Sequence, residues 1–151
     1  MKHSTDTELI VITKEKLDIN LALEFIVLPW TGGTSCFIGT TRNSFNDNVV
    51  QTLFYEAYEP MEVKEMLNVC KTIRENYSVG NICMRHRLGE VSVKEASVIV
   101  AISAVHRAEA IKATELGINE LKGRVPIWKK EIYVDETSTW KENKESFWMK
   151  K

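Results

Sequence analysis

The sequence has 151 residues, of which 44% are hydrophobic and 27% are charged, a composition typical of one globular domain. Its 20 Lys and Arg residues nearly balance 21 Asp and Glu residues, so the formal net charge is -1. Nonspecific nucleic-acid binding needs a large excess of positive charge. We therefore expect no nucleic-acid partner.

The N-terminus, MKHSTDTEL, has acidic residues where a secretory signal would have an apolar core. The longest apolar stretch, around residues 98–105, is far shorter than the roughly 20 residues that span a bilayer. Cys36, Cys70 and Cys83 form no CxxC pair, which favours buried thiols in a reducing compartment over disulfides or a zinc site. These features predict a cytosolic protein with no metal and no membrane segment.

The first third of the chain alternates between β-like and helical patterns. Residues 1–7 are predicted to be a flexible tail, and residues 8–13 a strand. Asp18 can cap a helix that ends before Pro29. Strands are predicted over residues 35–40 and 49–58, and the polar loop between them, residues 43–48, predicts that they pair as a hairpin.

The clearest helix begins at Pro60. Its charged residues, Glu62 among them, are interpreted as lying off the apolar face. Six apolar residues share one face, which predicts packing in the core: Val63, Met66, Leu67, Cys70, Ile73 and Tyr77.

Two more strands and a helix are predicted before the last strand. Residues 81–87 form a strand that closes at Leu88-Gly89, and residues 96–105 are apolar on both faces, as in a central strand covered on both sides. The next helix carries Ile111 and Leu121 on one face, and residues 127–134 form the last strand. No internal repeat or linker interrupts this order, which predicts one α+β domain over residues 8–151.

Cationic side chains gather after the central strand. His106 and Arg107 lie where that strand meets a helix, a junction that directs side chains and backbone N–H groups at ligands. The alternative is a hydrogen-bonded boundary residue at His106. Lys122 and Lys129 flank a Pro-Ile-Trp segment, where crowded cations could serve acid–base or acyl chemistry. The alternative is a pair of solvated surface lysines.

Arg42 is a further candidate, whereas two other features are not assigned to a site. Arg42 follows a strand and could clamp a phosphate with its planar guanidinium, or form a surface ion pair instead. Residues 33–39 lack the Gly-Lys-Ser/Thr ending of a phosphate-binding P-loop, which excludes that motif. His86 and Arg87 also end a strand, but the Leu-Gly turn after them accounts for their position, so we do not assign them to a site.

Several segments appear in a specific order: FIGTTRN (37–43), YEAYEPM (55–61), HRLGE (86–90), HR (106–107) and LKGRVPIWKKE (121–131). Together they resemble the large, catalytic subunit of molybdopterin synthase, the MoaE family, over about residues 8–148. The tail, residues 138–148, is similar to the eukaryotic members. Two departures are minor: AEAIKA follows the His-Arg pair where an aromatic residue is common, and Gly32-Gly33 replaces the more usual Gly-Ala.

The resemblance implies an α/β hammerhead fold with a small antiparallel β subdomain. It also implies a sulfurtransferase of molybdenum cofactor biosynthesis that converts cyclic pyranopterin monophosphate into molybdopterin. Sulfur would arrive as a thiocarboxylate on the C-terminal glycine of a small ubiquitin-like subunit. The assembly implied is a heterotetramer built on a large-subunit homodimer, with no metal or diffusible cofactor in the sulfur transfer.

The resemblance also assigns site residues. It implies that Lys122 and Lys129 are catalytic and that they contact substrate. The other substrate-binding residues that it implies are Thr40, Thr41, Arg42, His106, Arg107, Lys130 and Glu131.

Geometry adds one expectation. His106 and Lys122 are 16 positions apart, and a straight helix over that interval would span roughly 24 Å and leave the two side chains on nearly opposite faces. We therefore predict that each site is shared, with lysines from one subunit and His106 and Arg107 from its mate. Two other functions stay open: a non-catalytic adaptor that binds a ubiquitin-like tail or acidic peptide in a basic groove, and a sensor of a phosphate ligand.

Overall fold

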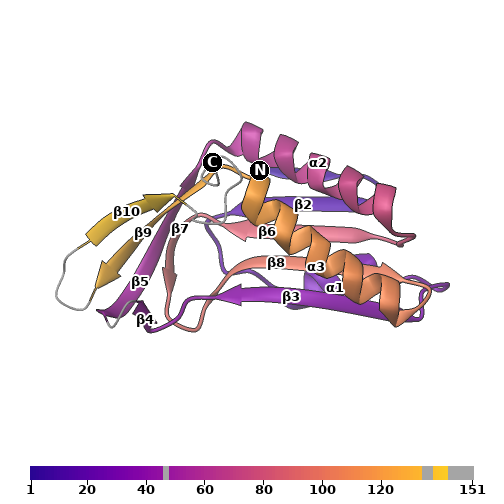
Figure 1. Cartoon of the computed structure of the whole chain (residues 1–151), viewed down its shortest axis with the longest axis horizontal. Helices are drawn as coiled ribbons and strands as arrows, with labels where there is room; N and C mark the ends of the chain where they lie inside the picture. The colour runs from indigo at the N-terminus through magenta and orange to yellow at the C-terminus, as the bar shows by residue number, and fades with distance from the viewer. Residues whose placement is uncertain (46–47, 134–137, 143–151) are drawn as a thin grey trace.

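The structure is a computed structural model that describes residues 1–45, 48–133 and 138–142. Within these residues, three helices and two β-sheets form an α+β fold, as predicted (Figure 1). The larger sheet has the strand order β1 (Lys2–Ser4), β2 (Glu8–Thr13), β6 (Ile82–Arg87), β8 (Ala96–Ala104), β3 (Gly33–Thr40). The helices are α1 (Ile19–Ile26), α2 (Glu59–Asn76) and α3 (Arg107–Arg124).

The larger sheet is mixed. Strands β2 and β6 are parallel, whereas the pairs β1–β2, β6–β8 and β8–β3 are antiparallel. Strand β8 lies inside the sheet, and all of its residues after Ala96 are buried. The prediction of a central strand covered on both sides is confirmed.

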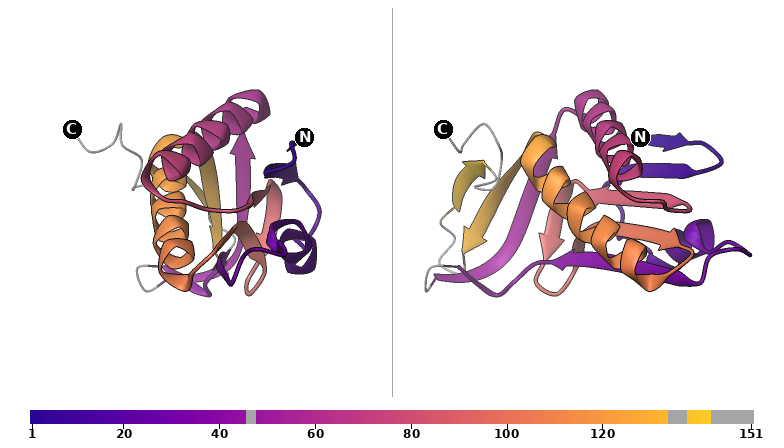
Figure 2. Two further views of the ribbon diagram at one scale, coloured as in Figure 1. Left: turned by 90° about the vertical axis from the view of Figure 1, so that its right-hand side faces the viewer. Right: turned by 45° about the vertical axis from the view of Figure 1, so that its right-hand side comes forward.

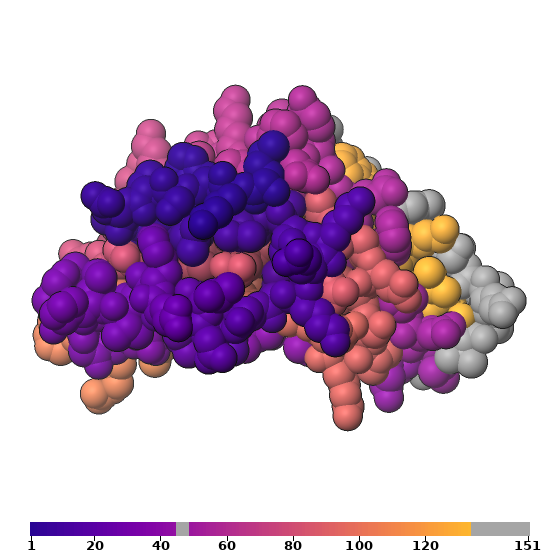
Figure 3. Space-filling model, turned by 180° about the vertical axis from the view of Figure 1, so that it is seen from behind, coloured from indigo at the N-terminus to yellow at the C-terminus, as the bar shows by residue number. Residues whose placement is uncertain are grey.

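Helices cover both faces of this sheet. Helices α2 and α3 pack on one face, where Met66, Ile73 and Leu121 join Met84 and Val100 in the main core. Helix α1 packs on the other face, and the end-on view in Figure 2 places α1 (indigo) opposite α3 (orange). Seen from behind, the N-terminal segment covers much of that second face (Figure 3).

Helix α3 approaches the sheet closely because the middle of its buried face is made of small residues, Ala113, Thr114 and Gly117. A Cβ atom at Gly117 would lie 3.2 Å from the side chains of both Ile73 and Val100. Ile111, which the sequence placed on the apolar face, is instead 56% exposed. The buried stripe runs through Ala110, Ala113, Thr114, Gly117, Ile118 and Leu121.

The smaller sheet stands at one end of the larger one, at the left in Figure 1. Its strands are β4 (Ser44–Phe45), β5 (Asn48–Ala57), β7 (Gly89–Ser92), β9 (Ile127–Tyr133) and β10 (Ser138–Glu142). The long strand β5 pairs antiparallel with β4, β7 and β9, and β10 pairs with β9. The expected last residue of the final strand, position 134, and the tail over residues 143–148 lie outside the described residues.

The predicted hairpin of residues 35–40 with 49–58 is wrong. Strand β3 pairs with β8 in the larger sheet, whereas β5 belongs to the smaller sheet. The chain changes sheets at Thr41, whose N–H donates to the Glu95 carbonyl and whose own carbonyl accepts from the Lys94 N–H. These bonds fix the chain to the turn before β8, so β3 and β5 cannot fold back on each other.

Two further expectations need correction. The predicted tail, residues 1–7, contains β1, which pairs with β2 through Lys2, His3 and Ser4 and so covers an otherwise open sheet edge. Glu62, expected off the apolar face of α2, is fully buried. No helix in the described ranges is long and apolar enough to cross a membrane.

Candidate functional site

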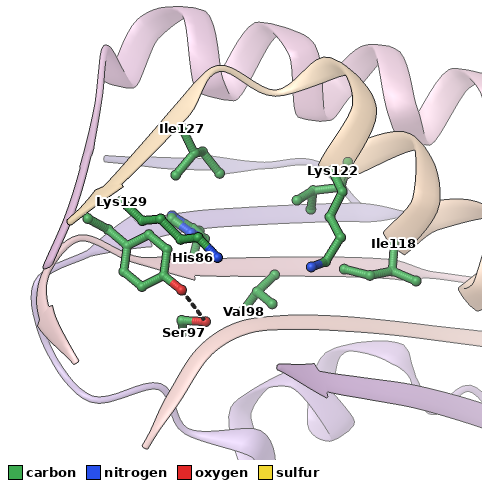
Figure 4. A pocket seen from close by; sticks show the side chains of 9 residues that line it. His86, Ser97, Val98, Ile118, Lys122, Ile127 and Lys129 are labelled. Carbon is green, nitrogen blue, oxygen red and sulfur yellow. Dashed lines mark hydrogen bonds between the residues drawn. The ribbon is translucent and has the colours of Figure 1, made fainter. Parts of the chain in front are cut away.

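Lys122 and Lys129 line a common hollow where the two sheets meet. Two adjoining hollows share Tyr55, Ser97, Val98 and both lysines, and together they form what we call the lysine pocket. Figure 4 shows the two lysines entering from different sides, with their amine nitrogens turned toward the space above Val98. The sequence prediction that these lysines gather at one place therefore agrees with the geometry.

The end of α3 and the start of β9 place the lysines. The Val125 N–H donates to the Leu121 carbonyl and closes the helix, and Pro126 then directs the chain into β9. In the register of the smaller sheet Lys129 is opposite Tyr55. Successive strand residues point to opposite faces, so the neighbouring Lys130 is not among the lining residues of the lysine pocket.

The outer part of the lysine pocket adds charge of both signs. Arg42 and Thr40, both exposed, line it together with Glu131. Glu131 is only 2% exposed, and its carboxylate accepts a 2.7 Å hydrogen bond from the Tyr133 hydroxyl. The lysine pocket thus has three cationic groups, one guanidinium and two amines, and one carboxylate that is hydrogen-bonded to Tyr133. This balance suits an anionic ligand.

Tyr55 contributes a hydroxyl at the centre of the lysine pocket. Its hydroxyl donates a 3.4 Å hydrogen bond to Ser97, drawn as the dashed line in Figure 4. Burial raises the pKa of Tyr55 above its ordinary value, the Ser97 hydrogen bond opposes this shift, and the nearby Glu131 carboxylate adds to it. The phenol therefore stays protonated near neutral pH.

Four predicted residues lie elsewhere than in the lysine pocket. Thr41 is 3% exposed, and its hydroxyl donates to the Val91 carbonyl, a contact that joins β3 to the smaller sheet. Lys130 lies on the other face of β9. His106 and Arg107 are exposed at the beginning of α3, which runs without a break to the turn that carries Lys122. Its 18 residues correspond to roughly 27 Å.

Sequence reasoning missed the Tyr55 and Ser97 hydroxyls of the lysine pocket, His86 at its inner end, and the Glu62 carboxylate next to His86. His86 lines the lysine pocket, and the imidazole Nδ1 lies 2.9 Å from a carboxylate oxygen of Glu62 on α2. Glu62 is four positions before Met66 and therefore lies on the same face of the helix. This spacing could have predicted that Glu62 is buried. In the described part of the chain, no group of three or more His, Cys, Asp or Glu residues is placed to hold a metal ion.

Comparisons with known proteins agree with one another. The family model described as "MoaE protein" matches residues 12–124. A zebra finch (Taeniopygia guttata) protein named molybdopterin synthase catalytic subunit is 51% identical over 148 residues, which cover 97% of this chain and 95% of the relative. The human protein of the same name is 48% identical over 141 residues, 93% of this chain and 74% of the relative.

A solved structure described as molybdopterin synthase from Staphylococcus aureus has the same fold. It superimposes with a TM-score of 0.82 at 33% identity, covering 92% of this chain and 98% of that one.

Proposed function

Because this chain belongs to the MoaE protein family, whose members are enzymes of molybdopterin synthesis, we propose that its lysine pocket is the place of sulfur transfer. The acceptor is cyclic pyranopterin monophosphate, and the donor is the C-terminal thiocarboxylate of a small ubiquitin-like subunit. The observation that carries this proposal is the convergence of Lys122 and Lys129 on one hollow beside Arg42.

The cyclic phosphate of the substrate needs cationic donors. Arg42 offers a planar pair of N–H donors at the mouth of the lysine pocket, and Thr40 lies beside it. The buried carboxylate of Glu131 offsets part of the positive charge of the lysine pocket. This attraction reduces the net cost of placing two lysine ammonium groups in the same pocket. These residues orient the pterin toward the lysines.

The lysines act on the acyl group of the small subunit. After sulfur has bonded to the pterin, the attack of water that releases the acyl group places negative charge on the acyl oxygen. Amine nitrogens held at a half-buried site stabilise such an oxyanion more than water does. Lys122 and Lys129 suit this role because they come from two separate elements and turn toward the same space.

We propose that a second copy of the chain completes each site. The uninterrupted α3 carries Lys122 at one end and Arg107 at the other, so a small ligand in the lysine pocket is out of reach of its own subunit's His106 and Arg107. In a homodimer within a heterotetramer, the mate's His106–Arg107 pair adds two more donors for the phosphate. Lys130 is proposed to contact the substrate or the small subunit from the outer face of β9.

The decisive experiment is incubation of the chain with thiocarboxylated small subunit and cyclic pyranopterin monophosphate, followed by detection of the dithiolene product. Formation of product supports the proposal. Binding of the small subunit with no product favours instead a non-catalytic adaptor that holds a ubiquitin-like tail in the basic groove. A cytosolic location and a domain that covers residues 8–151 remain predictions.

A further inference from the structure

We propose that His86, held by the buried Glu62, is the base that removes a proton from the water that releases sulfur from the small subunit. This inference rests on the proposed function. It assigns a role at the same site to two residues that neither the motifs nor the comparisons place there. The inference begins with the carboxylate of Glu62, which is fully buried and lies within 2.9 Å of the His86 imidazole.

The geometry is that of a carboxylate that orients an imidazole. Glu62, on α2, is fully buried, and His86, near the end of β6, is 2% exposed. The imidazole Nδ1 and a Glu62 oxygen are 2.9 Å apart. Within the described residues, neither the Glu62 oxygens nor Nδ1 of His86 make a hydrogen bond of ordinary geometry, so the approach to His86 is a close polar contact and the nearest one that Glu62 has.

A buried carboxylate is costly unless a proton donor faces it. In this proposal the ring proton of neutral His86 is on Nδ1, the nitrogen that faces Glu62, which leaves the lone pair on Nε2. Because His86 lines the lysine pocket, this lone pair is the basic group at its inner end. When Nε2 takes a proton, the resulting imidazolium faces the Glu62 carboxylate through Nδ1.

The other titratable groups around His86 are poor proton acceptors. From β5, the Tyr55 ring lies edge-on to the imidazole with centroids 5.4 Å apart, and burial raises the pKa of its hydroxyl, so it remains protonated. From α3 and β9 come Lys122 and Lys129, whose ammonium forms donate protons but cannot accept them. Glu62, from α2, is already engaged with Nδ1.

The reaction needs a proton acceptor at one defined step. When the thiocarboxylate sulfur has bonded to the pterin, the small subunit is attached through a thioester, –C(=O)–S–. Water must then attack the acyl carbon. Its proton passes to Nε2 of His86, the carbon–sulfur bond breaks, and the bonding electrons leave with sulfur as a pterin thiolate. The small subunit departs with a C-terminal carboxylic acid, and the imidazolium returns its proton to solvent.

The test is a single-turnover reaction of the enzyme with thiocarboxylated small subunit and cyclic pyranopterin monophosphate, followed by intact-mass analysis. In His86→Asn, sulfur attack should proceed while hydrolysis slows at least about tenfold, the lower end of what a positioned base contributes. A covalent conjugate of small subunit and pterin should therefore accumulate. Release by the wild type should also slow as the pH falls, since a protonated imidazole cannot accept a proton, and the variant should lose this dependence.

Wild-type release kinetics together with an absence of the conjugate in a folded His86→Asn would overturn the inference. Glu62→Gln, which keeps a hydrogen-bonding group but removes the charge, should also accumulate conjugate, and normal release by that variant counts against the role of Glu62. His3→Asn, on the edge strand β1, which β2 separates from β6, is the matched control and should behave as wild type. If neither site variant folds, a wild-type release rate that does not fall on acidification refutes the proposal by itself.

These outcomes are separable from failure of the proposed function. If the wild-type enzyme forms neither conjugate nor dithiolene, the sulfur-transfer assignment fails. If the wild type forms product and His86→Asn matches it at every pH, only the role of His86 is lost.

Discussion

Lys122 in the last turn of α3 and Lys129 in β9 line the same pocket, although the first belongs to a helix on the larger sheet and the second to the smaller sheet. A connection of two residues, Val125 and Pro126, joins these elements. The shared pocket of the lysines therefore depends on this turn as well as on the packing between the sheets.

Substitution of either lysine should reduce sulfur transfer. We expect Lys122→Ala and Lys129→Ala each to lower turnover at least about tenfold, because loss of one electrostatic donor typically costs ~2.7–4 kcal/mol of transition-state stabilisation. Lys112→Ala, an exposed position on the same helix, is the matched control and should keep wild-type turnover. Near-normal product formation by Lys122→Ala would contradict its assigned role.

Mixing inactive variants tests whether sites are shared between subunits. Lys122→Ala chains mixed with Arg107→Ala chains should regain activity, because one of the two sites in each mixed dimer then has intact lysines and an intact Arg107. Lys122→Ala mixed with Lys129→Ala provides the control, since both residues come from one subunit's pocket and no intact site can form. Equal activity in the two mixtures would argue against sharing.

Gly32 holds the backbone that leads to His106 and Arg107. Its N–H donates to the carbonyls of Ala104 and Val105, and a Cβ atom there would lie 2.6 Å from the Val105 oxygen. We expect Gly32→Ala to lower the free energy of unfolding by about 1–3 kcal/mol and to weaken substrate binding, because the backbone before His106 must move.

At Gly33 an added Cβ atom would lie 3.0 Å from the backbone N and Cα of Arg107, a tight contact but a less severe one than the 2.6 Å contact at Gly32. Gly33→Ala should therefore have the smaller effect in chemical denaturation. A Gly32→Ala protein with wild-type stability and affinity would show that the loop adapts freely.

The three thiols should differ in reactivity. Burial raises the pKa of Cys70 to about 12 and that of Cys83 to about 11, so at pH 8 hardly any thiolate is present at either residue. Burial also raises the pKa of Cys36, but this residue is exposed on β3. We expect alkylation of the native protein to modify Cys36 first and the other two only on unfolding.

Peptide mass mapping after timed alkylation measures this order, and reaction at all sites should accelerate as the pH rises because the thiolate fraction grows. Cys36→Ser should abolish the fast reaction. Rapid modification of Cys70 in the folded protein would mean that α2 opens readily.

Features that depend on nearby residues could be predicted from the sequence. Asp18 caps α1 as expected, and its carboxylate accepts a 2.9 Å hydrogen bond from the Asn20 N–H. The boundaries of β2 and the beginning of α2 near Pro60 also agree with the local patterns. Helix capping and the alternation of apolar residues in a strand depend on residues only a few positions apart. They can therefore be predicted from the sequence alone.

Pairing between distant segments could not be predicted in the same way. A polar loop between two β-like stretches favours a hairpin, but β3 finds its partner in β8, far along the chain. The contact between Glu62 and His86 was not predicted for a related reason. The charge of Glu62 was taken as a sign that this residue is exposed on α2. Only the partner across the fold explains why a carboxylate lies on the buried face.

The junction between the two sheets has a consequence for how this enzyme can change. Because its two amines come from elements of different sheets, a substitution that loosens the packing between the sheets should alter rate and rigidity together. Substitutions that change stability and leave turnover unaltered are therefore expected in the outer strands and on the exposed helix faces.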